Sequence, residues 1–149
     1  MNPTERPRPT WDAYGMLLAY AASLRSPDPY VQVGAACFRE DRSTIATGYN
    51  GGAPGDEVDW SDRELRRPHV VHAELNCLRY AETGEPYYLY VTLAPCKDCF
   101  ENIRLAGVQE IFYAEIYKRD TFAIDNAAQY GIVAHQLNIP YEHLRHTNN

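Results

Sequence analysis

The chain has 149 residues, and its 14 lysines and arginines against 20 aspartates and glutamates give a formal net charge of −6. This length suits one domain with its own core, and the acidic balance argues against general binding to nucleic acid. No apolar run approaches the ~20 residues of a membrane-spanning helix, and the first residues lack the pattern of a secretory signal. Four cysteines without such a signal favour a reducing, cytoplasmic setting, where cysteine binds metals more often than it forms disulfides.

The first part of the chain predicts an arm and then a helix. Residues 1–10 hold three prolines and no periodic pattern, so we expect a loose arm within a single domain that spans 1–149. A helix is expected to begin after Thr10, a capping residue, and to end before Pro27. Apolar residues repeat along it at helical spacing, and this face is expected to pack in the core; they are Trp11, Tyr14, Leu17, Leu18, Ala21 and Leu24.

The rest of the chain predicts an α/β fold. Strands at 31–38 and 44–49 flank a polar turn and indicate an antiparallel hairpin. The polar segment 51–71 is a long loop, of a length that is often functional, and Trp60 is expected to fix it. Helices at 73–80, 96–107 and 122–130 then alternate with strands at 88–93, 110–115 and 132–137. This order predicts three layers, α-β-α, around a five-stranded mixed, largely parallel sheet.

Two short motifs carry the candidate chemistry, His72-Ala73-Glu74 and Pro95-Cys96-Lys97-Asp98-Cys99. One imidazole and two thiolates suit a catalytic zinc site whose ligands are His72, Cys96 and Cys99, with water in the fourth position. The two cysteines are three residues apart and share a face in the first turn of a helix, where the helix N-terminus favours thiolates. His72 and Glu74 converge only if the start of their own helix points at the ion. The motifs therefore predict that two helix starts meet at the metal.

Glu74 is the candidate catalytic residue. We expect it to take a proton from the water, to protonate the ring nitrogen of a substrate base, and then to protonate the departing amine. Each motif alone has a simpler interpretation, since His-x-Glu occurs by chance and Cys-x-x-Cys also serves redox or structural roles. Cys77 or Cys37 as a fourth ligand would close the site and leave a non-catalytic, zinc-stabilised binding module.

Beyond these motifs, several segments together resemble the zinc-dependent cytidine deaminase superfamily and, within it, the deoxycytidylate (dCMP) deaminases. The likeness runs from about residue 11 to residue 136 and rests on 25–29, 32–35, 48–51, 72–76, 90–99 and 115–117. The zinc motifs identify only the superfamily. The resemblance is narrowed to the dCMP deaminases and close relatives by two further segments, Gly48-Tyr49-Asn50-Gly51 and Arg25-Ser26. The resemblance implies hydrolysis of dCMP to dUMP and ammonia, with one zinc ion in each subunit.

The resemblance also implies substrate contacts. Tyr117 matches a substrate-binding tyrosine, and Asn50 is expected to hold the sugar hydroxyl. Arg25 and Ser26 are candidates for the phosphate, and Lys118-Arg119 adds positive charge nearby. Simpler roles exist for these cations: Arg25 could pair with the carbonyls at a helix end, and 118–119 could be a solvated turn.

Regulation and assembly are implied in the same way. Family members are commonly hexamers that dCTP activates and that dTTP inhibits together with Mg²⁺. The effector site involves the segment that corresponds here to Gly48, Tyr49, Asn50 and Gly51.

Two alternative substrates stay open. Deaminases that act on a base within RNA or DNA use the same zinc ligands, although the acidic balance and the absence of a basic tail disfavour a polynucleotide here. A family member that accepts dCTP is the other alternative, because dCTP presents the same base as dCMP.

Overall fold

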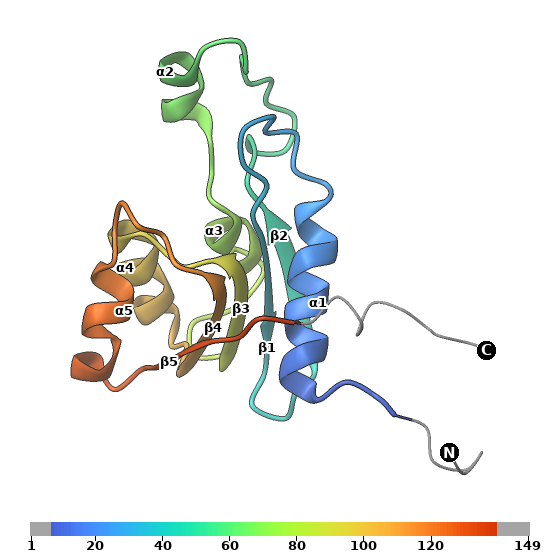
Figure 1. Ribbon diagram of the computed structural model, residues 1–149, viewed down its shortest axis with the longest axis vertical. Helices are drawn as coiled ribbons and strands as arrows, with labels where there is room; N and C mark the ends of the chain where they lie inside the picture. Colours follow the sequence, from blue (N-terminus) through green and yellow to red (C-terminus); the bar gives the residue numbers. More distant parts are fainter. Residues whose placement is uncertain (1–6, 140–149) are drawn as a thin grey trace.

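A computed structural model describes residues 7–139, in which five strands form one sheet in the order β2-β1-β3-β4-β5 (Figure 1). The strands are β1 (Gly34–Phe38), β2 (Thr44–Tyr49), β3 (Tyr88–Leu93), β4 (Glu110–Glu115) and β5 (Val133–Gln136). β1 is antiparallel to both β2 and β3, whereas β3 with β4 and β4 with β5 are parallel pairs. Four strands thus run in one direction and β1 runs against them, which confirms the predicted mixed sheet.

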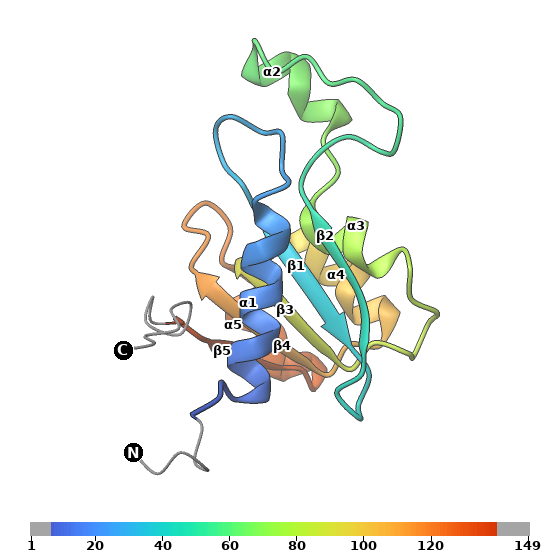
Figure 2. The same ribbon diagram turned by 90° about the vertical axis from the view of Figure 1, so that its right-hand side faces the viewer.

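Helices cover both faces of this sheet and complete the predicted three layers. Helix α1 (Trp11–Ser23) lies on one face, and α3 (Ala73–Leu78), α4 (Lys97–Ala106) and α5 (Phe122–Asn126) lie on the other (Figures 1 and 2). A short helix, α2 (Arg63–Arg66), and the 3-10 turn η1 (Arg67–His69) stand beyond the sheet. A second 3-10 turn, η2 (Ala127–Tyr130), continues α5.

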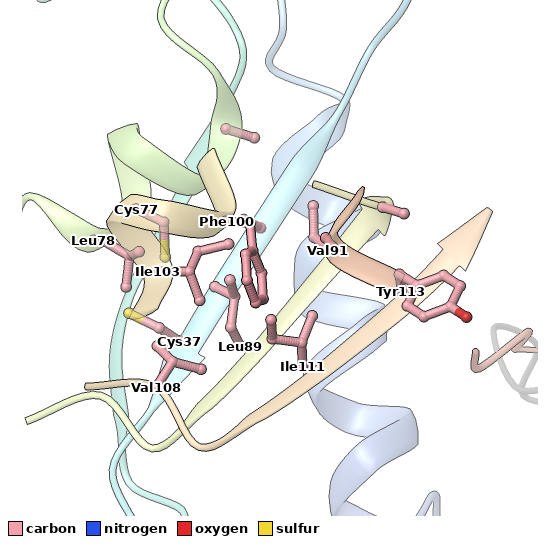
Figure 3. Close-up of a cluster of buried hydrophobic side chains, with 14 of the residues drawn as sticks. Cys37, Cys77, Leu78, Leu89, Val91, Phe100, Ile103, Val108, Ile111 and Tyr113 are labelled. Atoms are coloured by element: carbon pink, nitrogen blue, oxygen red, sulfur yellow. The ribbon is translucent and has the colours of Figure 1, made fainter. Parts of the chain in front are cut away.

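Strand alternation divides the core into two clusters. Successive residues of a strand point to opposite faces, so Cys37 of β1 packs under α3 and α4 while its neighbour Phe38 packs under α1. Figure 3 shows the larger cluster, where side chains of three strands meet those of α3 and α4; it includes Cys37, Leu89, Val91, Ile111, Phe100 and Ile103. This cluster fixes α3 and α4, the two helices that begin at the zinc motifs.

Helix α1 begins as predicted but buries a different face. The side chain of Thr10 caps it by accepting a hydrogen bond from the amide of Ala13 at 3.1 Å. The residues that face the sheet are small or slender, namely Ala13, Gly15, Met16, Ala19, Ala22 and Ser23. The predicted core face was wrong: Trp11, Tyr14 and Leu24 are 58%, 39% and 85% exposed.

Close approach explains this choice of face. A Cβ atom on Gly34 of β1 would lie 1.8 Å from the carbonyl oxygen of Ala19. The helix backbone therefore rests almost on the strand, and only small side chains fit between them.

Other element boundaries differ in ways that side-chain contacts explain. β1 begins at Gly34 and not at residue 31, because the amides of Tyr30 and Val31 donate to the Asp28 carboxylate and the amide of Val33 donates to Asn50. The long loop 51–71 contains α2 and η1, which were not predicted. Residues 1–6 of the predicted arm lie outside the described residues.

The sheet places three chain segments at one edge. β2, β3 and β4 all end there, so Asn50, Cys96 and Tyr117, which follow these strands, share that edge, as does Val33 at the start of the reversed strand β1. This is the carboxyl edge at which open α/β sheets bind ligands. Within 7–139, none of the helices has the length and apolar character that crossing a bilayer requires.

Candidate active site

Two helix starts meet at the candidate metal centre. His72 is the N-cap of α3 and Cys96 is the N-cap of α4. The Nδ1 atom of His72 lies 3.1 Å from the sulfur of Cys99 and 3.6 Å from the sulfur of Cys96. The potential ligand atoms of the three residues all lie within 4.8 Å of one another. The structure therefore brings the three predicted ligands together in the way that the spacing of the motifs indicated.

The first turn of α4 favours a thiolate at Cys96. Its sulfur accepts a hydrogen bond from the amide of Cys99 at 3.5 Å, which is the contact of a capping group. Hydrogen bonds from Cys99 and His72 lower the pKa of Cys96 to about 4. The side-chain hydrogen bond to Cys96, together with burial, raises the pKa of Cys99. The hydrogen bond with Cys96 and the charge of Glu74 raise the pKa of His72, against the opposing effect of burial.

The donor set and its dimensions fit zinc. Tetrahedral Zn²⁺ with bonds of 2.0–2.3 Å to nitrogen and sulfur holds those two atoms about 3.6 Å apart. The nitrogen of His72 lies at this distance from the sulfur of Cys96 and closer, at 3.1 Å, to that of Cys99. Neither of the other cysteines belongs to this group. Cys77 is fully buried in the core and lies 3.3 Å from the carbonyl oxygen of Ala46, and Cys37 packs in the same cluster (Figure 3). The fourth ligand that a closed, structural site requires is therefore not supplied by either residue.

Glu74 lies in the first turn of α3, two residues beyond His72, and is 4% exposed. It lines the same cavity as His72 and Cys96. Burial raises the pKa of its carboxyl group, while the charge of His72 acts in the opposite direction. A carboxyl group that is buried beside a metal site is placed to accept and to donate protons.

The cavity is large enough for a nucleotide-sized ligand. Its volume is about 390 Å³, within the range of small-molecule sites. The zinc motifs contribute His72, Glu74 and Cys96 to its lining, and the neighbouring strand ends contribute Val33, Asn50 and Tyr117. The loop 51–71 supplies Arg63, Glu64, Arg66 and Arg67, and Arg119 lines it as well. Segments that are far apart in the chain thus enclose one site.

Asn50 is built into the wall of this cavity. Its Nδ2 atom donates to the carbonyl oxygen of Val31 at 2.9 Å and to the carboxylate of Asp28 at 3.3 Å, so both amide hydrogens are used. Its Oδ1 atom accepts from the amide of Val33 at 2.8 Å and keeps one lone pair. That lone pair can accept a hydrogen bond from a ligand hydroxyl group, whereas the amide nitrogen has no donor left for a ligand.

Arg25 and Ser26 lie outside the cavity lining. The hydroxyl group of Ser26 donates to the carbonyl oxygen of Asn50 at 2.8 Å, and Arg25 is exposed beyond the end of α1. Of the predicted cations at 118–119, Arg119 lines the cavity and Lys118 does not. The phosphate role of Arg25 and Ser26 stays a prediction.

The segment 48–51 packs closely on α3. A Cβ atom on Gly48 would lie 2.4 Å from the amide nitrogen of Cys77, so only glycine allows β2 to approach the helix. The carbonyl oxygen of Tyr49 accepts from Asn76 of α3 at 2.8 Å, and Gly51 pairs with Val71 in an isolated bridge. These contacts give the segment a structural role, and its predicted part in effector binding stays a prediction.

A buried ion pair between two loops was not predicted from the sequence. Arg66 donates to the carboxylate of Asp28 at 2.5 Å, and both residues are more than nine-tenths buried. The guanidinium group of Arg66 also lies over the rings of Tyr30 and Trp60, at 4.7 Å and 5.9 Å. Its Nε atom is buried without a hydrogen-bond partner among residues 7–139. The arginine-rich stretch 63–67 in a polar loop was the available signal.

Comparisons with known proteins agree with this geometry. Residues 9–115 match the model of the cytidine and deoxycytidylate deaminase zinc-binding region. ComE operon protein 2 of Bacillus subtilis is 32% identical over 141 residues, which cover 89% of this chain and 74% of that protein. Human deoxycytidylate deaminase is 32% identical over 113 residues, which cover 69% of this chain and 64% of the relative. The match to the mammalian relatives thus spans slightly less than two thirds of their length.

Relatives from phages match over nearly their whole length. Deoxycytidylate deaminase of Mycobacterium phage D29 is 35% identical over 124 residues, which cover 71% of this chain and 95% of that protein. The crystal structure of dCMP deaminase from the cyanophage S-TIM5 in complex with dCMP and dUMP superposes with a TM-score of 0.76 at 27% identity. It covers 89% of this chain and 100% of that chain. With its zinc motifs inside the matched region, the chain belongs to the cytidine and deoxycytidylate deaminase zinc-binding family.

Proposed function

We propose that the protein is a zinc-dependent enzyme that hydrolyses dCMP to dUMP and ammonia. The observation that carries the proposal is the position of Glu74, a buried carboxyl group that lines one cavity with the predicted ligands His72 and Cys96. The names of several relatives support dCMP as the substrate, and one related structure was solved in complex with dCMP and dUMP.

Glu74 moves the protons of the proposed reaction. Zinc, when bound, acts as a Lewis acid that brings the pKa of a water molecule toward neutrality. Glu74 accepts the proton that this water loses and passes it to the ring nitrogen next to the amine-bearing carbon, which makes that carbon electrophilic. The hydroxide that remains attacks this carbon. Glu74 then takes the proton of the newly bound hydroxyl group and passes it to the amine, so the C–N bond breaks and ammonia leaves. The buried position of Glu74 keeps bulk water from competing for these protons.

The remaining contacts orient the nucleotide. The free lone pair on Oδ1 of Asn50 is suited to a sugar hydroxyl group, and Tyr117 lines the same cavity. A polynucleotide is the less favoured substrate, because the chain carries a net charge of −6. dCTP stays an alternative, since it differs from dCMP only beyond the first phosphate.

Regulation and assembly are proposed from the family resemblance alone. On that basis dCTP activates the enzyme, dTTP inhibits it with Mg²⁺, and the segment 48–51 takes part in the effector site. A homo-oligomer, commonly a hexamer, and a cytoplasmic location are proposed on the same grounds.

An ammonia-release assay tests the proposed reaction. The zinc-loaded protein is given dCMP, deoxycytidine, dCTP and a short cytosine-containing oligonucleotide, each alone and with dCTP or dTTP as effector. We expect the highest kcat/KM for dCMP. A higher kcat/KM for the oligonucleotide, falling steeply with salt, would identify a polynucleotide deaminase, and no turnover of any substrate would contradict the proposal.

A further inference from the structure

The exposed residues that line the cavity carry more positive than negative charge. Arg63 and Arg67 lie at α2 and at the turn that follows it, and Arg119 lies between β4 and α5. Among the exposed lining residues the only carboxylate is that of Glu64, because Asp28 and Glu74 are buried. On a chain with a net charge of −6, these arginines give the cavity a local positive charge that suits an anionic ligand.

The ion pairs of the cavity leave two of its arginines unmatched. Arg66 is paired with Asp28, and Arg67 lies 4.0 Å from Glu64 in an exposed pair that contributes little. Arg63 and Arg119 form no ion pair with any residue of 7–139. Their guanidinium groups are therefore available to a ligand, and guanidinium is well matched to phosphate oxygens.

Buried contacts hold helix α2 in place beside the cavity. Arg66, the last residue of α2, anchors it through the buried pair with Asp28 and the rings of Tyr30 and Trp60. Arg63 is three residues earlier on the same short helix, so its backbone is held over the cavity while its side chain stays exposed. A side chain on an anchored backbone loses less freedom when it binds a ligand.

We propose that Arg63 and Arg119, assisted by Arg67, bind the 5′-phosphate of the nucleotide substrate. This assignment rests on the proposed function, because it places the cytosine ring at Glu74 and the phosphate at the other end of the cavity. It gives the phosphate to residues that line the cavity, in place of Arg25 and Ser26, which do not line it. The loop 51–71 then selects a nucleotide over a nucleoside.

Kinetics with paired substrates test this assignment. We expect Arg63→Ala and Arg119→Ala each to raise KM for dCMP by roughly 10- to 100-fold, since each loses charge-assisted hydrogen bonds to phosphate. KM for deoxycytidine, which has no phosphate, should change far less. Arg63→Lys should recover part of the affinity for dCMP, because lysine keeps the charge but not the paired donors.

Two comparisons make the outcome decisive. Arg79→Ala removes an exposed arginine outside the cavity lining and should leave KM for both substrates unchanged. Arg25→Ala tests the other candidate phosphate site directly. A selective loss of dCMP affinity in Arg25→Ala, with none in Arg63→Ala or Arg119→Ala, would overturn the assignment.

A binding measurement separates this inference from the proposed reaction. Calorimetric titration with dUMP and with deoxyuridine requires no turnover. If Arg63→Ala weakens dUMP binding but not deoxyuridine binding, the phosphate site stands even for a protein that fails to release ammonia. Equal affinities of wild type and both variants for dUMP would refute the site, whatever the activity.

Discussion

At the scale of single residues, the site depends on where two helices begin. His72 and Cys96 are N-caps, so their side chains and the first-turn residues Glu74 and Cys99 are directed toward one point from two helices. The contact between the amide of Cys99 and the sulfur of Cys96 and the low pKa of Cys96 are local consequences of that arrangement. Ligands that are 24 residues apart in the chain are therefore positioned by short-range structure once the sheet has placed both helix starts.

A matched pair of cysteine substitutions tests the assignment of ligands. We expect Cys99→Ala to lose stoichiometric zinc, because three protein ligands become two. Cys77→Ala should keep zinc and lose only about 1 kcal/mol of unfolding free energy, as for a small buried apolar group. Metal analysis by mass spectrometry and urea unfolding check both results. Loss of zinc in Cys77→Ala would show that Cys77 is a ligand.

At the scale of elements, the buried pair of Asp28 and Arg66 connects the loop 51–71 to the wall of the active site. Asp28 accepts hydrogen bonds from the amides of Tyr30 and Val31 and from the side chain of Asn50. Arg66 brings the loop to this carboxylate. The loop that supplies the cavity's outer arginines and the asparagine proposed to hold the sugar are thus parts of one network.

Breaking this pair on one side should destabilise the protein strongly. We expect Arg66→Leu to lower the free energy of unfolding by about 3 kcal/mol, because it leaves the Asp28 carboxylate buried without its counter-charge. Proteolytic cleavage within 51–71 should become faster in this variant.

A double-mutant cycle provides the control for this prediction. Adding Asp28→Asn to Arg66→Leu should cost much less than the sum of the two single changes, as measured by urea unfolding. Additive effects of the two substitutions would show that the pair does not couple the loop to the wall.

Most elements could be predicted from the sequence because their signals are local. β2, β3 and β4 have the predicted bounds, and α4 is capped by Gly107, whose φ of 95° is the left-handed conformation that glycine favours. The buried face of α1 could not be predicted from periodicity, because close contact with Gly34 selects small residues over the larger apolar ones. Helix α2 could not be predicted either, because it is held by an ion pair between Arg66 and Asp28, which is far away in the chain.

At the scale of the whole molecule, the sheet order determines which motifs meet. β1 lies between β2 and β3, so the ends of β2, β3 and β4 bring Asn50, Cys96 and Tyr117 to one edge. The zinc motifs and Glu74 could be predicted because their spacing reflects helix geometry. The outer arginines could not, since their position over the cavity depends on how the loop 51–71 folds back toward the sheet edge.

Charge is distributed unevenly between the molecule as a whole and the cavity. The chain as a whole is acidic, and its net negative charge disfavours the binding of polyanions such as nucleic acid. Positive charge is concentrated among the exposed residues of the cavity lining, whereas Glu74, two residues from the metal ligand His72, is buried. A small ligand that combines an anionic group with a neutral ring matches both features.

The most direct test of the central claim is to measure bound zinc and dCMP turnover on the same preparations of wild type and Glu74→Gln. Glutamine keeps the size of the side chain but cannot carry protons between water, ring and amine. We predict that the variant holds as much zinc as wild type and that its kcat falls by at least about 100-fold. A variant that loses its zinc would show that Glu74 is a ligand, and one that keeps both zinc and full turnover would show that Glu74 is not the catalytic acid and base.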